Sequence, residues 1–116
     1  MNIEDFRTYC LTKPGTTEDF PFDNKTLVFK VMGKMFALTS IESFSSVNLK
    51  CDPEKALDLR ADYSGILPGY HMNKKHWNTV SVNEDVTDQM VRELTDHSYQ
   101  LVVKSLPKKL RLELTS

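Results

Sequence analysis

Residues 68 to 82 read PGYHMNKKHWNTVSV and combine side chains that could bind a polyanion. The segment holds two of the three histidines, the single tryptophan and a Lys-Lys pair, and it contains no acid. Lysines contact phosphates, and an aromatic ring provides a surface on which a base stacks. We therefore interpret the stretch as a contact segment, in which Lys74 and Lys75 supply charge and an outward-facing Trp77 supplies a stacking surface.

Other chemistries find less support in the residue pattern. His71 and His76 are five residues apart, so in an extended strand they point to opposite faces and cannot share a metal ion. Cys10 and Cys51 lie far apart, outside any CxxC pattern, and Cys51 is expected to be an inert core thiol. Paired carboxylates, a Gly-rich phosphate loop and a Ser/His/Asp signature do not stand out. We expect no enzymatic activity, no metal and no cofactor.

Length and composition restrict the class of protein. A chain of 116 residues predicts a single domain over residues 1–116. With 40% hydrophobic and 27% charged residues, and no apolar run near the ~20 residues that span a bilayer, it is expected to be soluble. Two cysteines and a polar, acidic N-terminus favour the cytoplasm. Because the net charge is −1, affinity for a polyanion would have to come from one face.

The elements that position the segment begin with a short helix. Apolar residues at helical spacing from Ile3 to Leu11 precede Lys13-Pro14-Gly15, which cannot continue a helix. Phe20 and Phe22 alternate with polar or proline residues, which predicts an edge strand at best.

Residues 27–40, LVFKVMGKMFALTS, predict a β-hairpin. Gly33-Lys34 suits the two central positions of a type II′ turn, which would pair Val31 with Phe36. Alternation would then place a set of apolar side chains on one face and Lys30 on the other. The predicted apolar set is Leu27, Phe29, Val31, Phe36 and Leu38.

The remaining chain alternates strands and helices. Residues 46–51 predict a half-buried strand with Lys50 outward, 53–60 a helix, 62–69 a loop, and 77–82 a strand. In the last strand Val80 and Val82 face the core, Trp77 faces outward, and His76 and Asn78 share the parity of the valines. A helix from about residue 85 to 104 follows. The predicted fold class is α+β: a two-layer sandwich whose antiparallel sheet is covered by helices on one face and left open on the other.

Across nearly its whole length the sequence resembles the MmcQ/YjbR-like family of small bacterial proteins. The resemblance is strongest in the Gly33-Lys34-Met35-Phe36-Ala37 hairpin and in the run from Pro68 to Asn78. It implies a fold similar to the CyaY or frataxin-like α+β sandwich and a DNA-binding role based on hairpin wings. It implies no enzymatic activity.

We therefore expect a DNA-binding protein that uses the open sheet face and the hairpin wing. Two alternatives remain open: a protein-interaction module anchored by the same Trp77 face, and a small-ligand pocket lined by residues 71–78. A membrane partner is not expected, and the oligomeric state is left open. The candidate nucleic-acid-binding residues are Lys30, Lys34, Lys50, His71, Lys74, Lys75, His76, Trp77 and Asn78.

Overall fold

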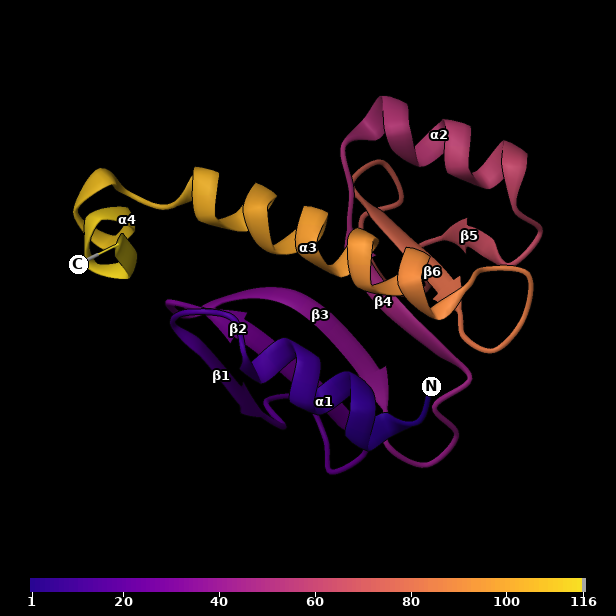
Figure 1. The fold of residues 1–116 in the computed structure, drawn as a ribbon, viewed down its shortest axis with the longest axis horizontal. Helices are drawn as coiled ribbons and strands as arrows, with labels where there is room; N and C mark the ends of the chain where they lie inside the picture. Colours follow the sequence, from indigo (N-terminus) through magenta and orange to yellow (C-terminus); the bar gives the residue numbers. More distant parts are fainter. Residues whose placement is uncertain (116) are drawn as a thin grey trace.

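An antiparallel sheet of six strands, in the order β1-β2-β3-β4-β6-β5, forms the centre of the molecule (Figure 1). The structure is a computed structural model that describes residues 1–115, and within them the fold is α+β, with four helices. The strands are β1 (Thr16–Asp19), β2 (Thr26–Val31), β3 (Lys34–Ser40), β4 (Ser46–Lys50), β5 (Ile66–Pro68) and β6 (Trp77–Ser81). The helices are α1 (Ile3–Leu11), α2 (Pro53–Asp62), α3 (Asp88–Ser105) and α4 (Lys108–Thr115).

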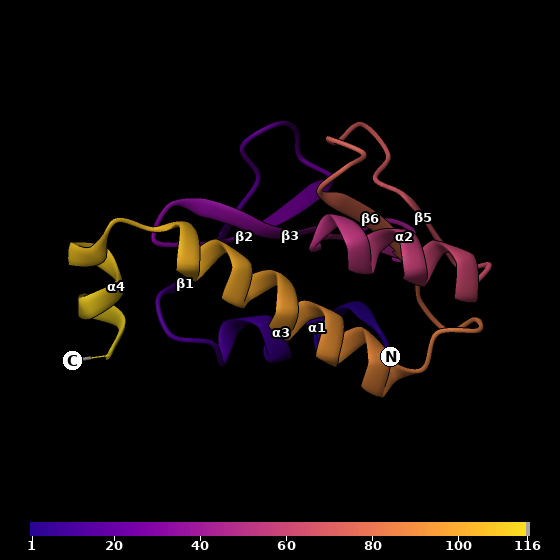
Figure 2. The same ribbon diagram turned by 90° about the horizontal axis from the view of Figure 1, so that it is seen from above.

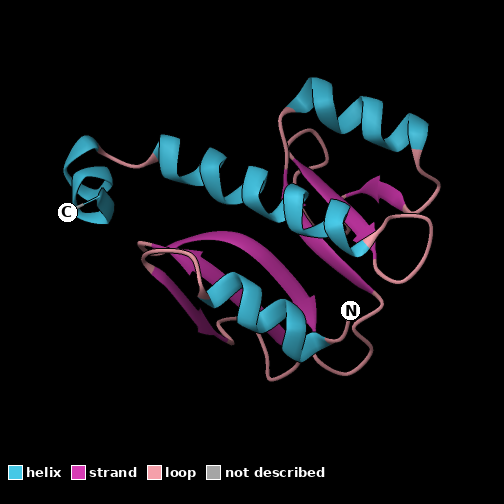
Figure 3. Cartoon of the chain, in the orientation of Figure 1, coloured by secondary structure: helices cyan, strands magenta, loops and turns pink. Residues whose placement is uncertain are grey.

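Helices and strands, distinguished by colour in Figure 3, form two layers that are seen edge-on in Figure 2. Helices α1 and α3 lie against one face of the sheet, and α2 adds Ala56 and Leu59 to the same hydrophobic core. The loops 20–25 and 69–76 rise from the opposite face (Figure 2). The arrangement confirms the predicted sheet with helices on one face. We call the other side the helix-free face.

Local sequence signals start the helices where expected. The Asn2 side chain accepts a hydrogen bond from the Asp5 backbone N–H, and the Asp5 carboxylate accepts one from the Asn2 N–H, which together form a capping box for α1. Asp52 caps α2 by accepting from the Lys55 N–H, and Pro53 follows at the first helical position.

The β2–β3 hairpin forms, but its turn and register differ from the prediction. The central turn residues are Met32 and Gly33, at φ 50° and 86°, and Val31 pairs with Lys34. Two positive φ values are those of a type I′ turn, whose twist matches the flanking strands better than the predicted type II′ turn at Gly33-Lys34.

A β-bulge at Phe36 then changes the pattern of faces along β3. Phe29 pairs with Ala37 whereas Lys30 pairs with Met35, so Phe36 is the extra residue, and both Phe36 and Ala37 are fully buried in the main core. Beyond the bulge the parity is reversed. Leu38 consequently lies on the helix-free face, and its predicted place in the main core was wrong.

Three short elements did not follow from the sequence. The edge strand is Thr16–Asp19 rather than the Phe20 and Phe22 stretch. Its inward residue Glu18 pairs with Arg7 of α1, so no buried apolar side chain marks this strand in the sequence. Strand β5 has only three residues and lies within the predicted loop 62–69, and α4 follows Pro107 with no buried residue. None of the three carries an apolar pattern long enough to detect.

Candidate functional site

Trp77 lies on the helix-free face, as its parity predicts, but it is not exposed. Only 8% of the residue is accessible, and it forms a second hydrophobic cluster with Val28 and Leu38. Met35 and Met72 pack against this cluster. The expectation of an outward tryptophan available for stacking or for anchoring a partner was therefore wrong, because the chain beyond β5 folds back over the ring.

The segment that covers Trp77 is held by its own backbone. The Gly69 N–H donates to the Trp77 carbonyl at 2.8 Å, and the Asn73 side chain accepts hydrogen bonds from the N–H groups of Lys75 and His76. The Lys74 ammonium group donates to the Gly69 carbonyl at 3.0 Å. Lys74 therefore closes the loop 69–76 as well as carrying charge.

Arg60 of α2 fastens the same loop to the core. Its Nε donates to Oδ1 of Asn78 at 2.7 Å, and its Nη2 donates to the carbonyls of Lys74 and Trp77. Asn78 is 2% accessible and lies on the core face of β6, so it positions Arg60 and is not available to a nucleic acid. Sequence reasoning missed Arg60, because nothing in its local pattern indicates a partner 18 residues further along the chain.

The candidate lysines do not all lie on one part of the surface. Lys30 faces an acid of the neighbouring strand, with 3.5 Å between its Nζ and Oδ2 of Asp19. Lys34 is exposed at the tip of the β2–β3 hairpin, and Lys50 is half-buried beside Trp77 on the helix-free face. Lys75 lies instead against the side of α2.

The two candidate histidines differ in exposure. His71 is exposed at a φ of 59°, with its ring centroid 4.0 Å from that of Tyr70. His76 is half-buried, and its carbonyl accepts a hydrogen bond from the Cys51 N–H at 2.8 Å.

Strand pairing arranges the helix-free face into rows that run across the sheet. A hydroxyl row pairs Thr26 with Ser40 and Ser46 with Ser81, and the β3–β4 register continues to place Ser40 beside Ser46. The middle row is Val28, Leu38, Asn48 and Thr79. The third row contains Lys30, Met35, Lys50 and Trp77. The face therefore changes from hydroxyl groups at one end to lysines at the other.

A cleft of about 560 Å³ opens over the hydroxyl end of this face. Its walls come from the two loops that rise in Figure 2. One wall is formed by Phe22 and Asp23, and the other by residues 70–72. The lining residues are Phe22, Asp23, Thr26, Leu38, Thr39, Ser40, Ser46, Asn48, Tyr70, His71, Met72 and Thr79. We refer to this site as the cleft.

Hydrogen bonds fix the shape of the cleft. Thr79 Oγ1 donates to Oδ1 of Asn48 at 2.6 Å and accepts from the Tyr70 N–H at 2.9 Å, which ties the loop 69–76 to the floor. On the opposite wall the Asp23 carboxylate accepts from the N–H groups of Lys25 and Thr26. These backbone hydrogen bonds lower the pKa of Asp23, so the group is ionised at neutral pH.

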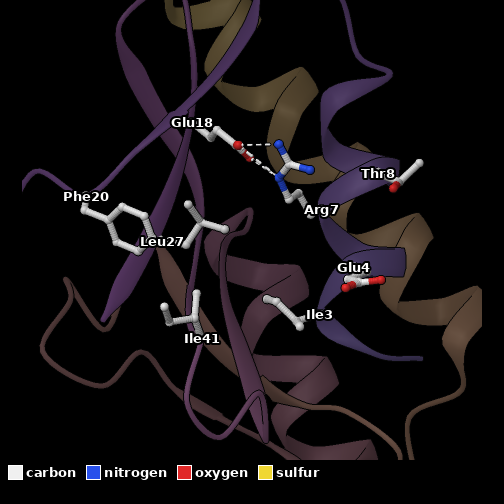
Figure 4. Close-up of a pocket in the computed structure, with 8 residues that line it drawn as sticks. All are labelled: Ile3, Glu4, Arg7, Thr8, Glu18, Phe20, Leu27 and Ile41. Atoms are coloured by element: carbon white, nitrogen blue, oxygen red, sulfur yellow. Dashed lines mark hydrogen bonds and ion pairs between the residues drawn. The ribbon is translucent and has the colours of Figure 1, made fainter. Parts of the chain in front are cut away.

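A second hollow of about 460 Å³ lies between α1 and the sheet (Figure 4). Ile3, Leu27 and Ile41 line its apolar part. Across the hollow, Nε and Nη2 of Arg7 donate to the Glu18 carboxylate at 2.7 to 2.9 Å, and the hydrogen bond raises the pKa of Arg7. Because the arginine and its nearest acid satisfy each other, the hollow presents fewer open polar groups than the cleft.

Neither thiol is exposed to solvent in the described residues. Cys10 and Cys51 are buried, and burial raises the pKa of both thiols, that of Cys51 to about 11. Within residues 1–115, no three His, Cys, Asp or Glu side chains gather closely enough to hold a metal ion. Among the helices of the same residues, none is both long and apolar enough to cross a membrane.

The fold and the cleft define a class: small α+β proteins with helices on one face of a single sheet and a loop-bounded cleft on the other. The chain belongs to the YjbR family, whose model matches residues 11–101. This confirms the resemblance seen in the hairpin and in the run from Pro68 to Asn78.

Relatives of known sequence and structure agree with the assignment. The chain is 43% identical to the Escherichia coli O157:H7 protein YbdF over 91% of this chain and 88% of that protein. It is 37% identical to Escherichia coli K12 YjbR, over 96% of this chain and 95% of that protein. The crystal structure of the Deinococcus radiodurans protein DR2400 superposes with a TM-score of 0.91 at 43% identity, covering 98% of this chain and 88% of that one.

Proposed function

We propose that this protein binds a small polar organic molecule in the cleft. One observation carries the proposal: the segment that resembles the family most strongly forms a wall of the cleft through Tyr70, His71 and Met72, while the rest of that segment supports this wall. Trp77 packs beneath the loop, and the Lys74 ammonium closes it. The unusual composition of residues 68–82 is thereby explained by the construction of a site.

The dimensions and the lining of the cleft suit such a role. Small-molecule sites usually occupy roughly 300 to 1,000 Å³ and combine apolar walls with a few converging polar groups. Here the aromatic rings of Phe22 and Tyr70 border a floor of hydroxyl and amide groups. We propose binding rather than catalysis, because the carboxylate of the cleft, Asp23, is engaged by its own loop.

An NMR screen of small polar fragments against ¹⁵N-labelled protein tests the proposal. Backbone signals of residues 22–26, 46–48 and 70–72 should shift together. Ser46→Leu, which fills the floor, should abolish these shifts and keep a folded spectrum. Thr17→Leu places the same side chain at an exposed position of β1 and serves as the matched control. Shifts confined to the hollow beside α1, or no shifts with any fragment, would overturn the proposal.

DNA binding is a second candidate function, supported by the lysines that lack partners. Within residues 1–115, the ammonium groups of Lys34, Lys50 and Lys75 take part in no ion pair or hydrogen bond, so they remain free to contact phosphates. Replacing Lys34 and Lys50 by Ala should flatten the slope of log K against log salt by about 1.8, since each phosphate contact contributes roughly 0.9. Lys104→Ala combined with Lys109→Ala serves as the control on α3 and α4. An unchanged slope, or no salt-dependent affinity of the wild type, would exclude DNA binding through these two lysines.

We also propose two finer points that the sequence leads us to expect. One is the likeness of the fold to the CyaY or frataxin-like sandwich, and the other is a cytoplasmic location.

A further inference from the structure

The charges that line the cleft argue against an anionic ligand. Within residues 1–115, no lysine or arginine lines it, and its ionisable side chains are Asp23, Tyr70 and His71. Lys30 and Lys50 belong to the row at the other end of the sheet face. A phosphate or carboxylate placed in the cleft would meet the Asp23 carboxylate and no fixed cation, which disfavours an anionic ligand. The Asp23 carboxylate in turn is satisfied by the N–H groups of Lys25 and Thr26, so it does not require a cation, and an uncharged group suits the cleft best.

The walls offer flat, accessible surfaces. Phe22 is 64% accessible and Tyr70 is 69% accessible, although large aromatic side chains usually bury their rings. The Tyr70 ring also contacts the His71 ring, and the two ring centroids are 4.0 Å apart. Exposed aromatic faces on both walls suit a ring that stacks against them, because each ring removes water from the other without needing a charge.

The floor offers both donors and acceptors beneath these rings. Oδ1 of Asn48 accepts from Thr79, whereas Nδ2 of Asn48 has no partner among the described residues. The Ser46 hydroxyl is likewise without a side-chain partner there, and Ser40 Oγ accepts from the Glu42 N–H and retains its own proton to donate. The free N–H group of the Asn48 amide can donate to an acceptor of a nucleobase edge, and the Ser46 hydroxyl can either donate or accept, so together they can match the alternating donors and acceptors along that edge.

Resting on the function proposed above, we infer that the ligand is a nucleoside or a similar uncharged heteroaromatic molecule. Its ring lies between Phe22 and Tyr70, and its hydrogen-bonding edge faces Asn48 and the hydroxyl row. The ribose, or its equivalent, projects toward the open mouth of the cleft. The absence of a fixed cation distinguishes this site from one built for nucleotide phosphates.

Titrations monitored by ¹⁵N NMR test the inference with the full chain. The probes are adenosine, guanosine, cytidine and uridine, with the monophosphate of each as its charged counterpart and methyl glucoside as an uncharged molecule without a flat ring. At least one nucleoside should shift the signals of residues 22–26, 46–48 and 70–72. Its monophosphate should bind no more tightly than the nucleoside, and the glucoside should not bind.

Three variants test the assigned roles. Phe22→Ala and Tyr70→Ala should each weaken nucleoside binding roughly tenfold, the size of one base-stacking contact. Asn48→Asp keeps the acceptor for Thr79 but removes the N–H donors, and it should weaken binding by about tenfold or more. Leu67→Ala removes a side chain that is 56% accessible on the same sheet face but outside the cleft, and it should leave affinity unchanged.

The outcomes separate this inference from the function on which it rests. Shifts of the cleft signals by the glucoside but by no nucleoside would overturn the nucleoside assignment and leave the proposed function standing. Tighter binding of the monophosphate, lost at high salt, would also overturn it. Should neither these probes nor the fragment screen shift the cleft signals, both conclusions would be wrong.

Discussion

Truncating Trp77 to alanine should remove a large part of the stability of this protein. A tryptophan buries about 150 to 250 Å² in a folded protein, which corresponds to about 4 to 6 kcal/mol of transfer free energy at 25 cal/mol/Å². Trp77 is 8% accessible, so most of this term applies. Because its small cluster lies under a surface loop that can partly collapse, we expect a loss of about 3 to 5 kcal/mol, the usual range for Trp→Ala.

Urea denaturation followed by far-UV circular dichroism measures this loss. Tryptophan fluorescence cannot report on the variant, since Trp77 is the only tryptophan. A typical domain has about 5 to 15 kcal/mol of stability, so the variant should unfold at much lower urea concentration. Leu67→Ala, on the same sheet face and 56% accessible, should change the free energy of unfolding by less than about 0.5 kcal/mol. A Trp77→Ala variant that loses less than about 1 kcal/mol would show that the ring is not buried as described.

Two further predictions concern the contacts of α2. Nε2 of His97 accepts a hydrogen bond from the Asp52 N–H at 3.2 Å, and burial is the main cause that lowers the pKa of His97 below 6.5. Below about pH 6.5 the unfolded chain therefore binds more protons than the folded one, so the free energy of unfolding should fall as the pH drops from there through the folded-state pKa. His97→Gln should remove this part of the pH dependence. An identical pH profile for the variant would contradict the assignment. Arg60→Met should lower the free energy of unfolding by about 2 kcal/mol, because it leaves Oδ1 of Asn78 buried without its donor. It should also speed hydrogen exchange at the Gly69 N–H, which lies in the loop that Arg60 holds. An unaltered exchange rate there would show that Arg60 does not hold the loop.

The sequence by itself determined the layers of this protein. Alternating apolar residues in four segments identify four of the six strands, β2, β3, β4 and β6, and most of the core face, because a strand that buries one face must repeat every two residues. Asp52-Pro53 marks the start of α2, because those residue types satisfy the free N–H groups of a first turn. The same parity placed Trp77 and Val80 on opposite faces of β6, as the structure confirms.

Only the tertiary structure decided which side chains of the helix-free face are covered and which line a cleft. Parity gives the face of a side chain but not what covers it, so the burial of Trp77 depended on the path of residues 69–76. The bulge at Phe36 moved Leu38 to that face, and no local signal indicates where one extra residue enters a strand. The cleft itself joins loops 20–25 and 69–72, whose side chains meet only because the strand order places β2, β3, β4 and β6 side by side. Long-range pairing of this kind is a property of the folded chain and is not encoded in any single segment.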